Sequence, residues 1–178
     1  MNSIDQNQPE TNRESLSGKA AAQKIKELAE QAQTCFFCTE KLGEDRKGTR
    51  PMSVQKVDDD GTLWFLSPND SFTNAEIEAD PHVKLFFQGS PHSDFMMIEG
   101  NAYASTDPSK IKELWKPVLK TWFTEGEQDP RITVIRVDPQ SGYYWDTKHG
   151  TMVAGIKMLI GAISGKTLDD SIQGDLNV

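Results

Sequence analysis

The stretch Asp58-Asp59-Asp60-Gly61-Thr62-Leu63-Trp64-Phe65-Leu66-Ser67 indicates how this chain folds, because it joins a turn directly to a strand. An Asp-Gly pair ahead of a β-prone run is a strong hairpin signal. Residues 49–57 alternate in polarity, with Met52 and Val54 on one face, so we predict that they form the other strand. Three consecutive acids could suggest a calcium loop, but the spacing of an EF-hand is absent and a solvated turn is favoured.

Short strand-like segments continue on both sides of this hairpin. We predict strands at residues 34–39, 82–88, 95–104, 132–137 and 142–146, with a turn at 41–48 and a bulge or barrel corner at Gly100. Helices are predicted at residues 18–33, 72–79 and from 108 towards 122, while the apolar residues 153–163 fit either a strand or a helix. Because short turns connect the strands, the fold class is mainly β, an antiparallel β-barrel of about six strands with peripheral helices.

The chain of 178 residues fits one domain with tails. We predict a flexible N-terminal tail at residues 1–16, the domain at 17–165 and a C-terminal tail at 166–178. The net charge of −8 makes nucleic acid and anionic membranes poor partners. Because neither an apolar run of about 18 residues nor a signal-peptide pattern is present, we expect a cytoplasmic protein.

Sequence motifs for catalysis and metal binding are absent. The chain has no GxSxG, P-loop or GxGxxG pattern, and its three histidines are scattered, so no catalytic residue is assigned and no metal is expected. Cys35 and Cys38 form a CxxC pair, but in a β-prone segment residues i and i+3 point to opposite faces. We therefore expect two reduced structural thiols rather than a redox or zinc site.

Three stretches could nevertheless bind a ligand. Arg50, in Arg50-Pro51-Met52-Ser53, could reach a phosphate from a strand, although most lone arginines are solvated. Leu66-Ser67, with Ser71 beyond, could offer hydroxyl and N–H groups to a phosphate or a polyol, although a capped helix after a core strand is the simpler explanation. Tyr143-Tyr144-Trp145 could wall a flat heteroaromatic ring or belong to the core.

Taken in order, these stretches and their neighbours resemble a known family. The sequence is similar to the general stress protein 26 family, within the pyridoxamine 5′-phosphate oxidase-like FMN-binding split barrels. The likeness covers about residues 18–165, and no single motif is diagnostic. It rests on Arg50-Pro51-Met52, Asp60-Gly61-Thr62-Leu63-Trp64-Phe65, Ser71, Ile77, Pro81-His82-Val83, Ile98-Glu99-Gly100-Asn101-Ala102, Leu114-Trp115, Trp122-Phe123, Asp129-Pro130 and Tyr144-Trp145-Asp146.

The resemblance implies an FMN site, with FAD as a second option, shared by the two subunits of a homodimer. In the family, a basic residue helps hold the phosphate at the position of Thr73, so this chain has one positive charge fewer there. We expect Arg50 to be the main positive charge facing the phosphate; the alternative is that it pairs with a surface carboxylate such as Asp45. The partner subunit would contribute Phe95 and Trp145. The remaining cofactor contacts implied by the resemblance are Pro51, Met52, Ser53, Leu66, Ser67 and Ser71.

The resemblance does not extend to pyridoxamine phosphate oxidase activity. Gln55 replaces a lysine that holds the substrate phosphate in those enzymes, and Ala154 and Gly155 stand where an arginine is expected. Two hypotheses for a stress-related protein stay open: a flavin-dependent oxidoreductase of a small, unknown substrate, and a non-catalytic flavin sensor or carrier. A structural barrel with an empty cleft is a third interpretation.

Overall fold

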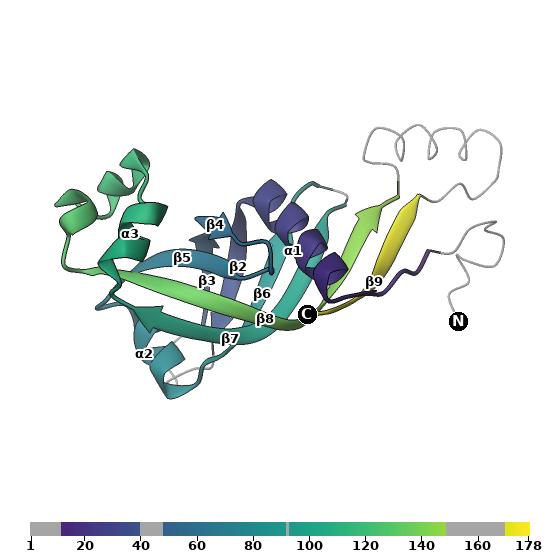
Figure 1. The fold of residues 1–178 in the computed structure, drawn as a ribbon, viewed down its shortest axis with the longest axis horizontal. Helices are drawn as coiled ribbons and strands as arrows, with labels where there is room; N and C mark the ends of the chain where they lie inside the picture. Colours follow the sequence, from purple (N-terminus) through teal and green to yellow (C-terminus); the bar gives the residue numbers. More distant parts are fainter. Residues whose placement is uncertain (1–11, 40–47, 92, 149–169) are drawn as a thin grey trace.

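The computed structural model describes residues 12–39, 48–91, 93–148 and 170–178, and within them the chain forms nine strands and three helices. Figure 1 shows α3 at one end of the molecule, paired strands β8 and β9 at the other, and α1 lying over the sheet between them. The helices are α1 (Lys19–Ala32), α2 (Phe72–Ala79) and α3 (Pro108–Leu114). The strands are β1 (Leu16–Ser17), β2 (Thr34–Thr39), β3 (Thr49–Ser53), β4 (Lys56–Val57), β5 (Leu63–Pro68), β6 (His82–Gln88), β7 (Phe95–Ser105), β8 (Ile132–Thr147) and β9 (Ser171–Asn177).

One strongly bent sheet contains all nine strands. Its order is β1-β9-β8-β7-β6-β2-β3, while β5 pairs with β4 and with the first half of β8. Every pairing is antiparallel except that of β1 with β9. The sheet does not close into a complete barrel, so the predicted mainly β fold with peripheral helices is confirmed in its split form.

Two apolar clusters support the sheet. The larger one places Ile25 and Leu28 of α1 on the strands, where Phe37 and Phe65 meet edge to face at 5.4 Å between ring centroids. The smaller one packs Ile111 and Leu114 of α3 on the start of β8. Both clusters follow from the alternation of the strands and the helical spacing of α1, because each element buries only one face.

Two of the predicted strand regions differ from the sequence-based expectations. Residues 49–57 form two strands, β3 and β4, because the Val54 and Gln55 N–H groups leave the ladder to reach the Gln33 and Trp64 carbonyls at 2.9 and 2.8 Å. Residues 132–137 and 142–146 belong to one strand, β8. Its pairing with β7 shifts register between Glu99 and Gly100 of β7, where the sequence predicted a bulge. A Cβ on Gly100 would lie 2.3 Å from the Asp138 carbonyl oxygen, so this position requires glycine.

The helix expected from residue 108 towards 122 ends early. Helix α3 stops at Leu114 because Trp115 is extended and Pro117 follows, which disfavours a helical residue before it. Two short 3₁₀ turns, Pro117–Thr121 and Gly126–Gln128, then lead the chain to β8. The predicted turn at 41–48, except for Gly48, and the ambiguous segment 153–163 lie outside the described residues.

Parts of both expected tails belong to the sheet. Residues 171–177, within the C-terminal tail predicted at 166–178, form β9 and pair with the second half of β8. Leu16, assigned to the N-terminal tail, pairs with Leu176 of β9. The pattern of β9 is a weak alternation, in which Gly174 and Leu176 are buried while their neighbours are not. An alternation this short gives little indication of a strand in the sequence.

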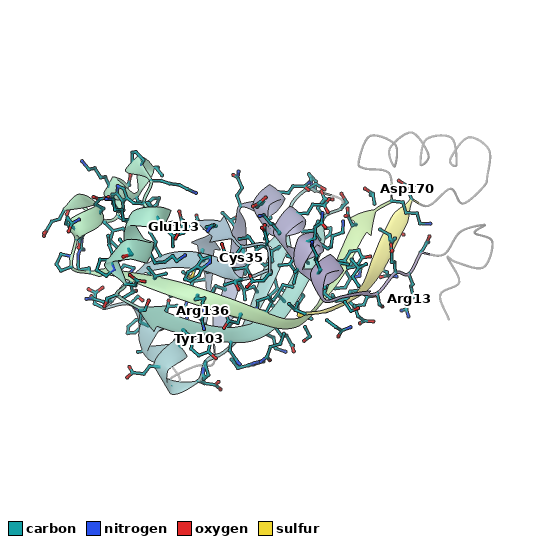
Figure 2. All side chains as sticks on the ribbon, in the orientation of Figure 1. Arg13, Cys35, Tyr103, Glu113, Arg136 and Asp170 are labelled. Atoms are coloured by element: carbon teal, nitrogen blue, oxygen red, sulfur yellow. The ribbon has the colours of Figure 1, made fainter. Side chains whose placement is uncertain are left out.

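The CxxC segment lies on a strand, as predicted. Cys35 is buried inside the sheet (Figure 2) and Cys38 is half-buried, and both are free thiols. Burial, with a smaller contribution from Cys38, raises the pKa of the Cys35 thiol. None of the helices in the described ranges is long and apolar enough to cross a membrane.

Candidate functional site

A cavity of about 380 Å³ opens where β3, the end of β5 and the start of α2 meet. Eight of the ten predicted cofactor contacts line it, and they come from separate segments of the chain. These eight residues are Arg50, Pro51, Met52, Ser53, Leu66, Ser67, Ser71 and Thr73. The cavity therefore brings together the first two of the three stretches that the sequence singled out.

Strand β3 forms one wall of the cavity. In it Arg50 and Met52 are half-buried, whereas Pro51 and its alternate neighbours are exposed. In the ladder β3 pairs only with β2, so Pro51 occupies an edge strand, where its missing N–H does no harm. Because residues 50–53 all line the cavity, the strand contributes side chains from both of its faces as well as its unpaired edge.

Arg50 is held in place by three side chains. Its Nη1 donates to the Thr73 hydroxyl, and its Nη2 donates to the Glu76 carboxylate and, at 3.1 Å, to the Thr39 hydroxyl. Thr39 in turn donates to Glu76 Oε2 at 2.6 Å. Glu76 is only 1% exposed, and its Oε1 accepts no hydrogen bond from the described residues.

This ion pair gives Arg50 a partner that the sequence did not predict. The arginine lines the cavity, as predicted, but its charge is already matched by a buried carboxylate on α2. The carboxylate proposed as the alternative partner, Asp45, lies outside the described residues. Nothing in the sequence distinguished Glu76 from the other acids, because its burial depends on how α2 packs against the sheet.

Hydroxyl groups gather at the other side of the cavity. The Ser67 and Ser71 Oγ atoms lie 2.8 Å apart, and the Ser67 carbonyl accepts a hydrogen bond of 2.7 Å from Thr133. Ser71 is the N-cap residue of α2, yet its side chain makes no capping bond. Its hydroxyl therefore belongs to the cavity rather than to the helix end, in contrast to the simpler explanation from sequence.

The segment after α3 covers the cavity with residues that sequence reasoning did not assign to the site. Leu119 and Phe123 anchor it in the smaller apolar cluster, and Trp122 lines the cavity while remaining 61% exposed. Gln55 and Pro68 complete the lining. Trp122-Phe123 formed part of the family likeness, but a continuous helix was expected there, so the direction of the indole could not be predicted.

Phe95 and Trp145 do not line this cavity. They are cross-strand partners on β7 and β8 and line a second cleft of about 410 Å³. Three aromatic side chains on this cleft, Phe36, Phe86 and Trp145, are 59%, 47% and 43% exposed. Pro51 lines both the cavity and this second cleft, so the two are neighbours.

Polar contacts hold the residues that adjoin Phe95 and Trp145 in the sequence. Asp94 precedes Phe95 and accepts a hydrogen bond of 2.8 Å from Gln31, while Asp146 follows Trp145 and pairs with Lys24 at 2.8 Å. Burial raises the pKa of Asp94, and so does its hydrogen bond with Asp146. Helix α1 thereby ties the ends of β7 and β8 together.

The charge distribution limits the chemistry of the cavity. Within the described ranges, Arg50 is the only charged residue that lines it, and no cluster of three or more histidine, cysteine or acidic side chains could hold a metal ion. The arrangement can therefore orient a ligand through hydroxyls, backbone and aromatic surface. It offers no nucleophile and base pair of its own.

Similar solved structures share this fold. A protein described as general stress protein 26 from Jannaschia sp. CCS1 superposes with a TM-score of 0.73 at 22% identity, covering 90% of this chain and all of that one. The general stress FMN/FAD binding protein of Xanthomonas citri gives a TM-score of 0.56 at 27% identity, covering 67% of this chain and 82% of its own.

Sequence comparison agrees with the structural one. Protein bli-3 of Neurospora crassa is 26% identical over 127 residues, which is 66% of this chain, and the match spans 61% of the length of that relative. The profile of the family described as pyridoxamine 5′-phosphate oxidase like matches residues 20–169, which include the whole cavity lining. The chain belongs to the pyridoxamine 5′-phosphate oxidase-like family.

Proposed function

We propose that this protein binds a flavin, FMN in the first place, in the cavity between β3, β5 and α2. The observation that carries the proposal is the convergence of eight predicted contacts on one cavity. Its volume of about 380 Å³ falls in the usual range for small-molecule sites. The general stress protein of Xanthomonas citri, which is similar over two thirds of this chain, is named as an FMN/FAD binding protein.

The residues present suit the parts of a flavin. The Ser67, Ser71 and Thr73 hydroxyls offer donors and acceptors for a ribityl chain, and Trp122, Leu119 and Phe123 offer apolar surface for a ring system. Arg50 lies at the same wall as Thr73, where a phosphate would reach. When bound, a flavin would supply electron-transfer chemistry, which the protein's own side chains lack.

The second part of the proposal is a two-fold homodimer that completes the site. Exposed Phe36, Phe86 and Trp145 form an apolar surface, which is costly to leave in water. Because this cleft adjoins the cavity through Pro51, a partner seated on it would bring its own Phe95 and Trp145 towards the flavin. This explains why the two residues lie apart from the other eight in one subunit.

The third part concerns turnover, for which we favour a flavin-dependent oxidoreductase of a small molecule. Trp122 is exposed at the edge of the cavity, so a second planar molecule could stack beside the flavin. The alternative is a flavin sensor or carrier without turnover. It is favoured because the described part of the chain places no ionisable side chain other than Arg50 in the cavity lining.

Titration of FMN fluorescence with the purified protein tests the binding. We expect saturable quenching, and its loss on replacing Ser67 and Ser71 together with valine. Unquenched FMN at protein concentrations up to about a millimolar, a weak limit by affinity standards, would contradict the site. Reduction of the bound flavin by a nicotinamide donor, faster than that of free FMN, would support the oxidoreductase over the carrier.

A further inference from the structure

The positive charge of Arg50 is neutralised by a carboxylate that does not itself line the cavity. Among the residues that the structure describes, Arg50 is the only charged one that lines the cavity, and Glu76, on the second turn of α2, pairs with it. Glu76 is 1% exposed, and a carboxylate so deeply buried is stable only while it is paired. The guanidinium and the carboxylate therefore act as one unit with no net charge.

The geometry of the pair also limits what Arg50 can offer to a ligand. A guanidinium has five N–H groups, and the contacts with Thr73, Glu76 and Thr39 use three of them, on both terminal nitrogens. A phosphate gains most from arginine when it binds two such groups in parallel. Both N–H groups of Nη2 are used, so a phosphate bound in this way would have to displace Glu76 or Thr39. Displacing Glu76 would leave the buried carboxylate without its cation.

The remaining polar groups of the cavity are neutral. Ser67, Ser71 and Thr73 suit the hydroxyls of a polyol as well as they suit a phosphate. The first turn of α2 begins at Ser71 and adds only the partial positive charge of a helix N-terminus. No second cation stands at Thr73 to compensate for the paired arginine.

We propose that Glu76 determines the specificity of the cavity by withholding the charge of Arg50, so that the flavin's ring and ribityl chain are recognised and its phosphate contributes little. Riboflavin and FMN then bind with comparable affinity. This inference rests on the proposed flavin binding and adds the chemical class of the preferred ligand. It treats Glu76 as a positioning residue, because Glu76 acts through Arg50 and does not line the cavity.

The test compares the dissociation constants of riboflavin and FMN, both measured by fluorescence quenching. For the unaltered protein we expect the riboflavin constant to exceed the FMN constant by less than about tenfold, well below the gain from an unopposed bidentate arginine. Glu76→Gln should raise this ratio at least tenfold by tightening FMN alone. Glu78→Gln removes the same charge from an exposed position on the same helix and should leave the ratio within about twofold.

A double variant keeps the test decisive if Glu76→Gln folds poorly. Arg50→Gln combined with Glu76→Gln removes both charges, so the ratio should stay within about threefold of the unaltered protein. Arg50→Gln alone leaves the acid unpaired and should make FMN the weaker ligand. A more than hundredfold preference for FMN in the unaltered protein, or a tenfold fall of the ratio in the double variant, would overturn the inference. Failure of both flavins to bind would instead overturn the proposed function.

Discussion

At the scale of single residues, environment separates side chains that look equivalent in the sequence. Cys35 and Cys38 stand three positions apart on β2, yet one is buried and the other half-buried. Glu76 and Glu78 stand two apart on α2, yet only Glu76 is enclosed. In each pair the element sets which face a residue occupies, and the packing on that face sets its chemistry.

The two thiols should react at very different rates. Because burial raises the pKa of Cys35 and blocks access to it, a thiol reagent at pH 8 should modify only Cys38 in the folded protein. The absorbance of the chromophore that the reagent releases should correspond to one reactive thiol per folded chain, and to a second thiol after denaturation. Cys38→Ser should remove the first phase, and rapid modification of Cys35 in that variant would contradict the assignment.

At the scale of elements, the segment that covers the cavity depends on one tight turn. Asp129 is buried and accepts hydrogen bonds from the Arg131 Nε at 3.0 Å and Nη2 at 2.7 Å, as well as from the Arg131 N–H. These contacts close the 3₁₀ turn against the start of β8. They hold the end of the covering segment, which contributes Trp122 and Phe123 to the cavity.

The same contacts predict a pH dependence of stability. Hydrogen bonds from Arg131, the largest cause, lower the pKa of Asp129 to about 2, against about 3.9 in an unfolded chain. Because the folded state holds its proton less tightly, Asp129 stabilises the fold above about pH 4, and this contribution is lost as the pH falls towards 2.

Denaturant midpoints of the unaltered protein and Asp129→Asn should therefore differ most near neutral pH and converge below pH 3. Asp138→Asn breaks an exposed pair with Arg136 and serves as the control. It should cost under about 1 kcal/mol at neutral pH. A constant gap between Asp129→Asn and the unaltered protein from pH 7 to pH 2 would contradict the role of the charge.

At the scale of the whole molecule, β8 organises both ligand-related surfaces. Its first half pairs with β5, which ends at the cavity, and its second half carries Trp145 to the second cleft. The outer face of the same sheet also holds Arg136 over the Tyr103 ring at 4.9 Å (Figure 2). One long strand thus sets the separation between the eight cavity residues and the two aromatic residues.

The proposed dimer predicts that binding and assembly fail together. A charge at Phe86, in the middle of the exposed aromatic surface, should be tolerated by a monomer but not by an interface. Light scattering of Phe86→Asp should therefore give a monomer mass, and FMN quenching should weaken with it. Val118→Asp alters an apolar residue that is more exposed than Phe86 and lies away from that cleft, so this variant should remain a dimer. A monomer mass for the unaltered protein at micromolar concentration would contradict the assembly.

The sequence determined the local elements and the family. The hairpin at residues 58–61, helix α2 and most strands followed from turn residues and alternation, which are local signals. The family resemblance also pointed to eight of the thirteen residues that line the cavity. Prediction from sequence failed at Val54 and within β8, where the polarity pattern does not show how the strands pair. Strand boundaries depend on the neighbouring strand and not only on the residues themselves.

Only the tertiary structure decided the electrostatics of the cavity. Arg50 and Glu76 are 26 positions apart, on β3 and α2, and no motif links them. Their pairing arises because packing α2 on the sheet buries one carboxylate, and a buried charge must find an opposite charge. The residue types that line the cavity are therefore visible in the sequence, whereas the net charge they present is a property of the fold.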